Sequence, residues 1–147
     1  MVPEIFGALC IRVLLIICLF TIVFLNNIAM NIAFVIPSML RGGAERAMSI
    51  LCNEFARKGD VVFLYLTEIA DNVEYPLVDD VNLVDLTVNL EPYIRKIPIF
   101  IKKIKKRIKE DNIDVVVSFI TRTNIYSIIA CKLAAVPLSL IHISEPT

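Results

Sequence analysis

The sequence contains no tryptophan, one histidine, four glycines and four cysteines among its 147 residues. Four glycines are too few for a collagen or a glycine-rich linker. The cysteines form no CxxC pair and are too sparse for a disulfide scaffold, and a single histidine argues against a zinc site. Fifteen lysines and arginines balance fifteen acidic residues, which argues against a broadly basic nucleic-acid binder. Apolar residues are abundant instead, at 57%, which excludes disorder and predicts one folded domain, with or without an appendage.

The first 29 residues are much more apolar than the remainder. Between residues 6 and 25 the only charge is Arg12, and a stretch of about 20 such residues is long enough to cross a bilayer. Three interpretations are open: a transmembrane anchor over residues 5–25, a cleaved signal peptide, or upstream sequence in front of a true start at Met30. A signal peptide has the least support, because no basic leading region or A-x-A cleavage site is visible. We treat this segment as separate from the domain that follows.

After Met30, patterns typical of strands and helices alternate. Short continuous apolar runs predict buried parallel strands at 32–36 and 61–66, and the run Val-Val-Val-Ser-Phe predicts another at 115–119. Residues 81–86, within an acidic stretch, are a further candidate strand. Apolar residues at helical spacing predict helices at 44–57, 95–109 and 123–134. Pro37 is expected to end the first strand, and Gly59 to end the first helix. The alternation predicts an α/β protein with a Rossmann-like, doubly wound parallel sheet over residues 30–137, preceded by the hydrophobic N-terminal segment.

The connection between the first strand and the first helix carries the most informative motif, Ser38-Met39-Leu40-Arg41-Gly42-Gly43-Ala44-Glu45-Arg46. Glycine lets the backbone approach a ligand closely, and the free N–H groups of a helix N-terminus attract anions. In open α/β sheets, ligands bind outside the carboxyl ends of the strands. Two interpretations are open: the glycines approach a phosphate or sugar, or they only form a tight turn. The absence of GxGxxG and of GKS or GKT makes nicotinamide and P-loop sites unfavourable.

Two segments together resemble glycosyltransferase family 4, whose members have the GT-B fold. The first is Phe34-Val35-Ile36-Pro37-Ser38 followed by Arg41-Gly42-Gly43-Ala44-Glu45-Arg46. The second is Val116-Val117-Ser118-Phe119-Ile120-Thr121-Arg122-Thr123-Asn124-Ile125-Tyr126, which is similar to the SF-x-T-R-T-N segment of bacterial members that extend lipid-linked or surface polysaccharides. The resemblance covers residues 31–137.

The resemblance implies transfer of a sugar from a nucleotide-sugar donor to a glycan or polyprenyl-linked acceptor, with retention of configuration and without a metal or other cofactor. It implies that this N-terminal domain mainly binds the acceptor, while its Gly-Gly loop approaches the donor phosphates. Residues carried over as substrate-binding are Gly42, Gly43, Glu45, Thr121, Arg122, Thr123 and Asn124. Glu45 has two open roles, as a partner of the helix N-terminus or as a substrate contact. Arg122 is the best candidate for an anion, because a guanidinium pairs with phosphate at two points.

Other roles are open for residues 121–124 and for the chain as a whole. Arg122 is alternatively a surface arginine, and Thr123 or Asn124 a helix N-cap. An alternative function is a small α/β ligand-binding module or a membrane-anchored interaction module without catalysis. A response-regulator-like module is disfavoured, because Ile36-Pro37-Ser38 supplies no carboxylate cluster at the end of the first strand.

The sequence also departs from the family pattern. The donor-binding domain with its paired glutamates is absent from these 147 residues, so we assign no catalytic residue and expect the chain to be inactive alone. Residues 138–147 carry Ser-Glu about three residues late and resemble a translated sequencing adapter. We therefore expect a non-native tail there, although its apolar part can still pair as a fifth strand.

Charge is strongly segregated along the chain. Residues 60–91 contain eight acidic and no basic residues, and residues 95–109 contain eight basic and no acidic residues. The basic helix has two interpretations: an ordinary solvated face, or a surface for anionic lipid headgroups through Lys102, Lys103, Lys105 and Lys106. The second predicts a position on the cytoplasmic side of the bacterial inner membrane, peripheral or anchored by residues 5–25.

Overall fold

The computed structural model describes residues 29–90 and 92–141. Five parallel strands form one sheet in the order β3-β2-β1-β4-β5. The strands are β1 (Asn31–Met39), β2 (Val61–Val73), β3 (Val81–Asp85), β4 (Val115–Phe119) and β5 (Leu138–Ile141). The helices are α2 (Gly43–Arg57), α3 (Lys96–Glu110) and α4 (Thr121–Ala134), with a short 3₁₀ turn, η1 (Tyr93–Arg95). The predicted α/β, Rossmann-like sheet is confirmed, whereas the predictions for the first 28 residues lie outside the described residues.

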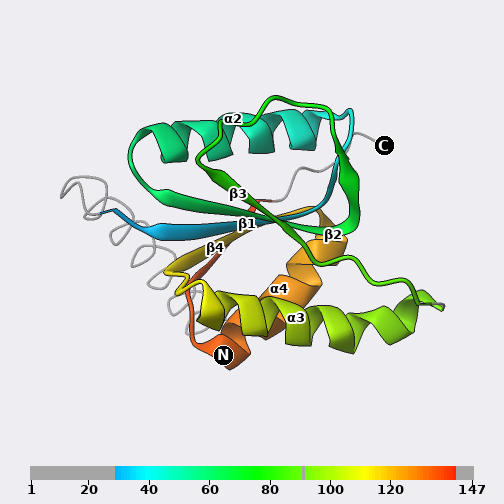
Figure 1. Cartoon of the computed structure of the whole chain (residues 1–147). Coiled ribbons are helices and arrows are strands. Elements are labelled where there is room, and N and C mark those ends of the chain that lie inside the picture. Colours follow the sequence, from blue (N-terminus) through cyan, green and yellow to red (C-terminus); the bar gives the residue numbers. More distant parts are fainter. Residues whose placement is uncertain (1–28, 91, 142–147) are drawn as a thin grey trace, which may run out of the picture.

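The helices cover both faces of the sheet. Helix α2 lies on one face, and α3 and α4 lie together on the other (Figure 1). The side chains of β1 point alternately into two hydrophobic cores, one on each face of the sheet. Ile32, Phe34 and Ile36 lie in the core beneath α2. Ala33 and Val35 lie in the core beneath α3 and α4. Because β1 is the central strand, all five side chains are buried. A continuous apolar run therefore marks this strand, as expected for a parallel sheet covered on both faces.

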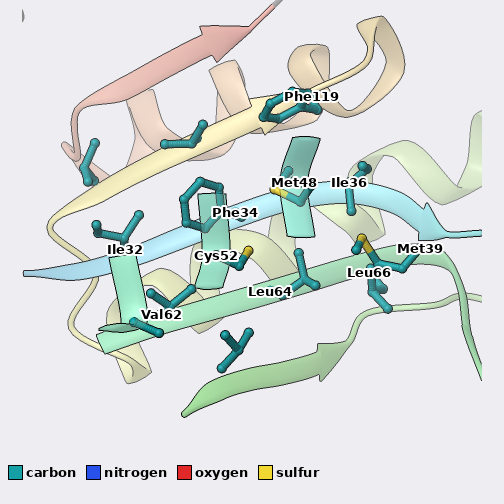
Figure 2. Close-up of a cluster of buried hydrophobic side chains, with 14 residues drawn as sticks. Ile32, Phe34, Ile36, Met39, Met48, Cys52, Val62, Leu64, Leu66 and Phe119 are labelled. Carbon is teal, nitrogen blue, oxygen red and sulfur yellow. The ribbon is translucent and has the colours of Figure 1, made fainter. Parts of the chain in front are cut away.

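The core beneath α2 is built around Phe34. Its side chain lies between the sheet and α2, with Met48 and Cys52 of the helix close by (Figure 2). The rings of Phe34 and Phe55 have centroids 5.9 Å apart. Burial raises the pKa of Cys52 to about 12, so this thiol is a neutral core group at physiological pH.

Helix α3 packs on the sheet through one apolar face. Phe100, Ile104 and Ile108 are buried, and Pro98 lies in the first turn, where its missing N–H costs no hydrogen bond. Ile94 lies outside this face, because it belongs to η1 and is 71% exposed. The buried face therefore begins within the helix itself.

Two strand boundaries differ from prediction because both strands continue past the regular apolar pattern. Pro37 does not end β1, which runs on to Met39. The pairing of β1 with β2 shifts register between Ile36 and Ser38, and again between Ser38 and Met39. Such an irregularity tolerates a proline, which cannot donate to the ladder. Strand β2 accordingly extends to Val73 instead of ending at Leu66.

Gly59 ends α2 as predicted. Its φ of 96° is a left-handed conformation that glycine adopts without steric cost. The Gly59 N–H donates to the Ala56 carbonyl (3.0 Å), and the Asp60 N–H donates to the Phe55 carbonyl (3.1 Å). These two bonds form a Schellman motif and satisfy carbonyls at the end of the helix.

No helix within the described ranges is both long and apolar enough to span a membrane.

Candidate functional site

The predicted substrate-binding residues form two clusters, one at residues 42–45 and one at residues 121–124, and both lie at the same edge of the sheet. Gly42, Gly43 and Glu45 follow β1, and residues 121–124 follow β4. Strands β1 and β4 are parallel neighbours, so their carboxyl ends lie at the same edge. The chain leaves β1 toward β2 on one side and leaves β4 toward β5 on the other. This divergence is a topological switch point, the place where ligands bind in open α/β sheets.

Helix α2 begins at this edge. Its N-cap residue is Gly42, which has no side chain with which to cap the helix. The first N–H groups of a helix have no intrahelical partner and carry partial positive charge. A Cβ added to Gly43 would meet no atom of the described structure within 4 Å. The space that a side chain at position 43 would occupy is therefore empty in the described structure.

Glu45 lies at the third position of α2 and folds back over the N-cap. A Cβ built on Gly42 would clash with a carboxylate oxygen of Glu45. Its negative charge is thus close to the positive end of the helix, where it is favourable. This placement supports the first of its two predicted roles, partner of the helix N-terminus; contact with substrate stays a prediction.

The segment that follows β2 contacts the loop at Gly42 and Gly43, which we call the glycine loop. We call residues 74–78 the strap; the sequence analysis did not predict their position. The Glu74 N–H donates to the Met39 carbonyl (2.9 Å), and Arg41 Nε donates to Glu74 Oε2 (2.6 Å). Tyr75 Oη donates to the Gly42 carbonyl (3.0 Å) and accepts from the Gly42 N–H (3.2 Å). The only sequence signal was an acidic stretch downstream of Arg41, which does not specify these partners.

The turn from β4 into α4 is held in an unusual conformation. Ile120, the N-cap residue, has φ 72° and ψ 138°, a region that β-branched residues rarely adopt. The Thr123 hydroxyl donates to the Ile120 carbonyl (2.9 Å) and to the Phe119 carbonyl. The Asn124 amide lies 2.7 Å from the Ser118 hydroxyl. With its nitrogen on this side, that amide also donates to the carbonyls of Ser118 (3.0 Å) and Ile120 (3.2 Å).

Two predictions for this cluster change as a result. Helix α4 begins at Thr121, two residues before the predicted start, so neither Thr123 nor Asn124 is the N-cap. Thr123 is 0% exposed and Asn124 is also buried, and both side chains bond within the turn. The groups of this cluster that face solvent are Thr121 and Arg122.

Arg122 reaches across the end of β1. Its side chain is 67% exposed, and Nη1 lies 3.8 Å from Oε1 of Glu68 on β2. Because β1 lies between β2 and β4 in the sheet, this pair spans the carboxyl end of β1. The contact between Arg122 and Glu68 is long and solvent-screened, so it contributes little energy by itself.

We predict that Ile120→Gly is more stable than Ile120→Ala by about 1 kcal/mol, because only glycine adopts the positive φ without steric cost. At Ile125, half-exposed within α4, the same pair of substitutions should give the opposite order, because glycine is the poorer helix former. Urea denaturation of the four variants measures both differences. A less stable glycine variant at position 120 would contradict the assigned conformation.

Thiol and metal chemistry have no support in the described part of the chain. Burial raises the pKa values of Cys52 and Cys131 to about 12, so neither is a thiolate nucleophile at neutral pH. No group of three or more His, Cys, Asp or Glu residues is arranged to hold a metal within residues 29–90 and 92–141. The absence of a metal requirement stays a prediction.

The four predicted lysines of α3 do not share one environment. Lys102 and Lys106 are exposed, whereas Lys103 and Lys105 are half-buried. Lys103 Nζ donates to the carbonyls of Thr87 (2.9 Å) and Leu86 (3.5 Å). Lys106 Nζ lies 3.5 Å from Glu110 Oε1 on the same helix. The helix therefore presents a narrower basic surface than the sequence suggested.

The fold and this edge together define a Rossmann-like domain with a glycine-led helix N-terminus at its switch point. Residues 41–142 match Glycosyltransferase Family 4, more than half of the chain, and the chain belongs to this family. The matched range includes both predicted clusters and extends through β5; the proposed boundary at residue 137 stays a prediction.

A solved structure shares the fold without close sequence relationship. The C-terminal domain of a hydrogenase from Pyrococcus furiosus superimposes with a TM-score of 0.54 at 11% identity. The similarity covers 76% of this chain and 89% of that domain. At this identity the likeness concerns the fold alone. No curated protein matches the sequence.

Proposed function

We propose that this chain is the acceptor-side half of a retaining, metal-independent glycosyltransferase that uses a nucleotide-sugar donor and a glycan or polyprenyl-linked acceptor. Membership of Glycosyltransferase Family 4 supports sugar transfer. The observation that carries the binding role is that the glycine-led N-terminus of α2 and the exposed guanidinium of Arg122 lie at the same edge of the sheet. Backbone N–H groups of a helix N-terminus and an arginine are complementary to a diphosphate.

The residues of this edge have separate tasks in the proposal. The N–H groups at Gly43 and Ala44 bind one phosphate, and Arg122 pairs with phosphate oxygens from the opposite side. Thr121, exposed beside Arg122, offers a hydroxyl to a sugar or phosphate. These groups bind and orient the substrate and exchange no proton with it.

The chain by itself is proposed to bind substrate without turning it over. Three carboxylates near this edge have partners: Glu45 lies over the N-cap, Glu68 contacts Arg122 and Glu74 pairs with Arg41. None is placed as a general acid or base for a glycosyl group. A sugar-transfer assay on the purified chain that showed turnover would overturn this part of the proposal.

The experiment that tests the binding role compares Gly43→Ala with the unchanged chain. The added methyl meets no described atom within 4 Å and improves helix propensity, so stability should be retained or slightly raised. The methyl also fills the space through which an anion approaches the helix N-terminus. We expect calorimetric titration with nucleoside diphosphates and inorganic pyrophosphate to show at least fivefold weaker binding. If neither probe binds the unchanged chain at millimolar concentration, the proposed function fails.

We also propose that α3 contacts an anionic membrane surface, with Lys102 and Lys106 as its exposed charges. Charge reversal of both residues should weaken binding to vesicles containing anionic lipid several-fold, because each lysine near such a surface is attracted electrostatically. The matched control reverses Arg46 of α2 and Lys58, the residue that follows the helix; both are exposed, and α2 covers the opposite face of the sheet. Equal losses in both double variants would show that net charge, and not the α3 surface, governs binding.

A further inference from the structure

We infer that Tyr75 is a positioning residue for the anion site at the N-terminus of α2, because its hydroxyl fixes the direction of the Gly43 N–H. The inference deepens the proposed function and rests on it, since it assumes that the glycine loop binds phosphate. Tyr75 belongs to the strap, 33 positions from Gly42 in sequence, and was not among the predicted site residues.

Tyr75 holds both polar groups of Gly42. With φ 178° and ψ 167°, Gly42 is fully extended, and in that conformation the N–H and C=O of one residue point to the same side. A tyrosine hydroxyl has one proton to donate and lone pairs to accept. It donates that proton to the Gly42 carbonyl at 3.0 Å and accepts from the Gly42 N–H at 3.2 Å. One side chain thereby selects a single conformation for a residue with unusually wide backbone freedom.

The orientation of the next N–H follows from peptide geometry. In a planar trans peptide, the carbonyl of one residue and the N–H of the next point in opposite directions. The Gly42 carbonyl points toward Tyr75 and also accepts from the Arg46 N–H (3.1 Å). The Gly43 N–H is therefore directed away from the strap and from the body of α2. Loss of the Tyr75 hydroxyl would remove one of the two hydrogen bonds that hold this peptide, leaving only the bond from the Arg46 N–H.

The strap holds Tyr75 firmly against α2. The Pro76 carbonyl accepts hydrogen bonds from Ser49 Oγ (2.7 Å) and Asn53 Nδ2 (2.9 Å). Asn53 Oδ1 accepts from the Val78 N–H (2.9 Å). Because the same helix supports the strap and presents the Gly43 N–H, the site is ordered before a ligand arrives. Such preorganisation reduces the entropy lost on binding.

Tyr75→Phe tests the inference, and Tyr65→Phe is the matched control. The Tyr65 hydroxyl donates to Asp111 Oδ2 (2.7 Å), and Asp111 precedes β4, at the opposite end of the sheet from the glycine loop. We expect Tyr75→Phe to weaken binding of inorganic pyrophosphate about fivefold, the equivalent of one ordinary hydrogen bond, and to raise the amide exchange rate of Gly42. Tyr65→Phe should lower stability without changing pyrophosphate affinity.

The outcomes separate this inference from the proposed function. If the unchanged chain binds pyrophosphate and Tyr75→Phe binds it equally well, the positioning role is wrong and the proposed function stands. If both phenylalanine variants lose affinity equally, the loss reflects general stability, and the positioning role is again wrong. If the unchanged chain does not bind, the proposed function fails and this inference fails with it.

Discussion

Replacing Arg122 with alanine is expected to lower the affinity of the chain for nucleoside diphosphates about tenfold to a hundredfold. A hydrogen bond to a charged group contributes about 1.5–3 kcal/mol, and about 1.4 kcal/mol corresponds to tenfold in affinity. Arg122→Lys should lose part of this affinity, because the ammonium keeps the charge but not the two-point fork. Calorimetric titration at fixed ionic strength measures both effects.

Two further variants, at Lys132 and at Glu68, complete the experiment on Arg122. Lys132 is exposed on the same helix, α4, so Lys132→Ala removes an equal charge away from the site and should leave affinity unchanged. Glu68→Gln removes the carboxylate 3.8 Å from Arg122 and should raise affinity, because that carboxylate repels and competes with phosphate. If Lys132→Ala and Arg122→Ala weaken binding equally, Arg122 has no specific role in the site.

Replacing Phe34 with alanine is expected to lower the free energy of unfolding by about 3–5 kcal/mol. Phe34 is completely buried in the central strand and contacts the ring of Phe55 on α2. Its removal costs the buried apolar area and leaves a cavity in the layer that positions the glycine loop. A domain of this size has about 5–15 kcal/mol of stability in total, so the variant should be largely unfolded by moderate urea.

Phe63→Ala is the matched control for this substitution. Phe63 lies on the neighbouring strand β2 and is half-buried, so the same change in side chain should cost clearly less. Urea denaturation followed by circular dichroism compares the two variants. Equal losses would show that Phe34 does not occupy the closed core assigned to it.

The fold was largely predictable because burial on both faces leaves a clear pattern in the sequence. Strand β4 was predicted to the residue, since four of the five residues of Val115–Phe119 are apolar and all five side chains are buried. The end of β2 was not predictable in the same way. Past Leu66 the strand enters mixed polar sequence, and its pairing with β1 becomes irregular. There, long-range strand pairing and not a local pattern determines the boundary.

The candidate site was predictable only in part, for a related reason. Both clusters follow from strand ends and motifs that are local in sequence, so their common edge could be inferred. The inward orientation of Thr123 depends on the positive φ of Ile120, which a β-branched residue does not suggest. Tyr75 contacts Gly42 through tertiary structure alone, and no motif marks it. Whether each of the seven predicted residues contacts substrate stays a prediction.

The most direct test of the central claim is a map of backbone amide shifts during titration of the chain with a nucleoside diphosphate. We predict that the largest changes in amide shift occur at Gly43 and Ala44, which follow β1, and at Thr121 and Arg122, which follow β4. These two segments are far apart in sequence and lie at the same edge of the sheet. Changes confined to the lysines of α3 would indicate nonspecific attraction of the anion. That result, or no change at either segment, would contradict the account of this edge as the substrate site.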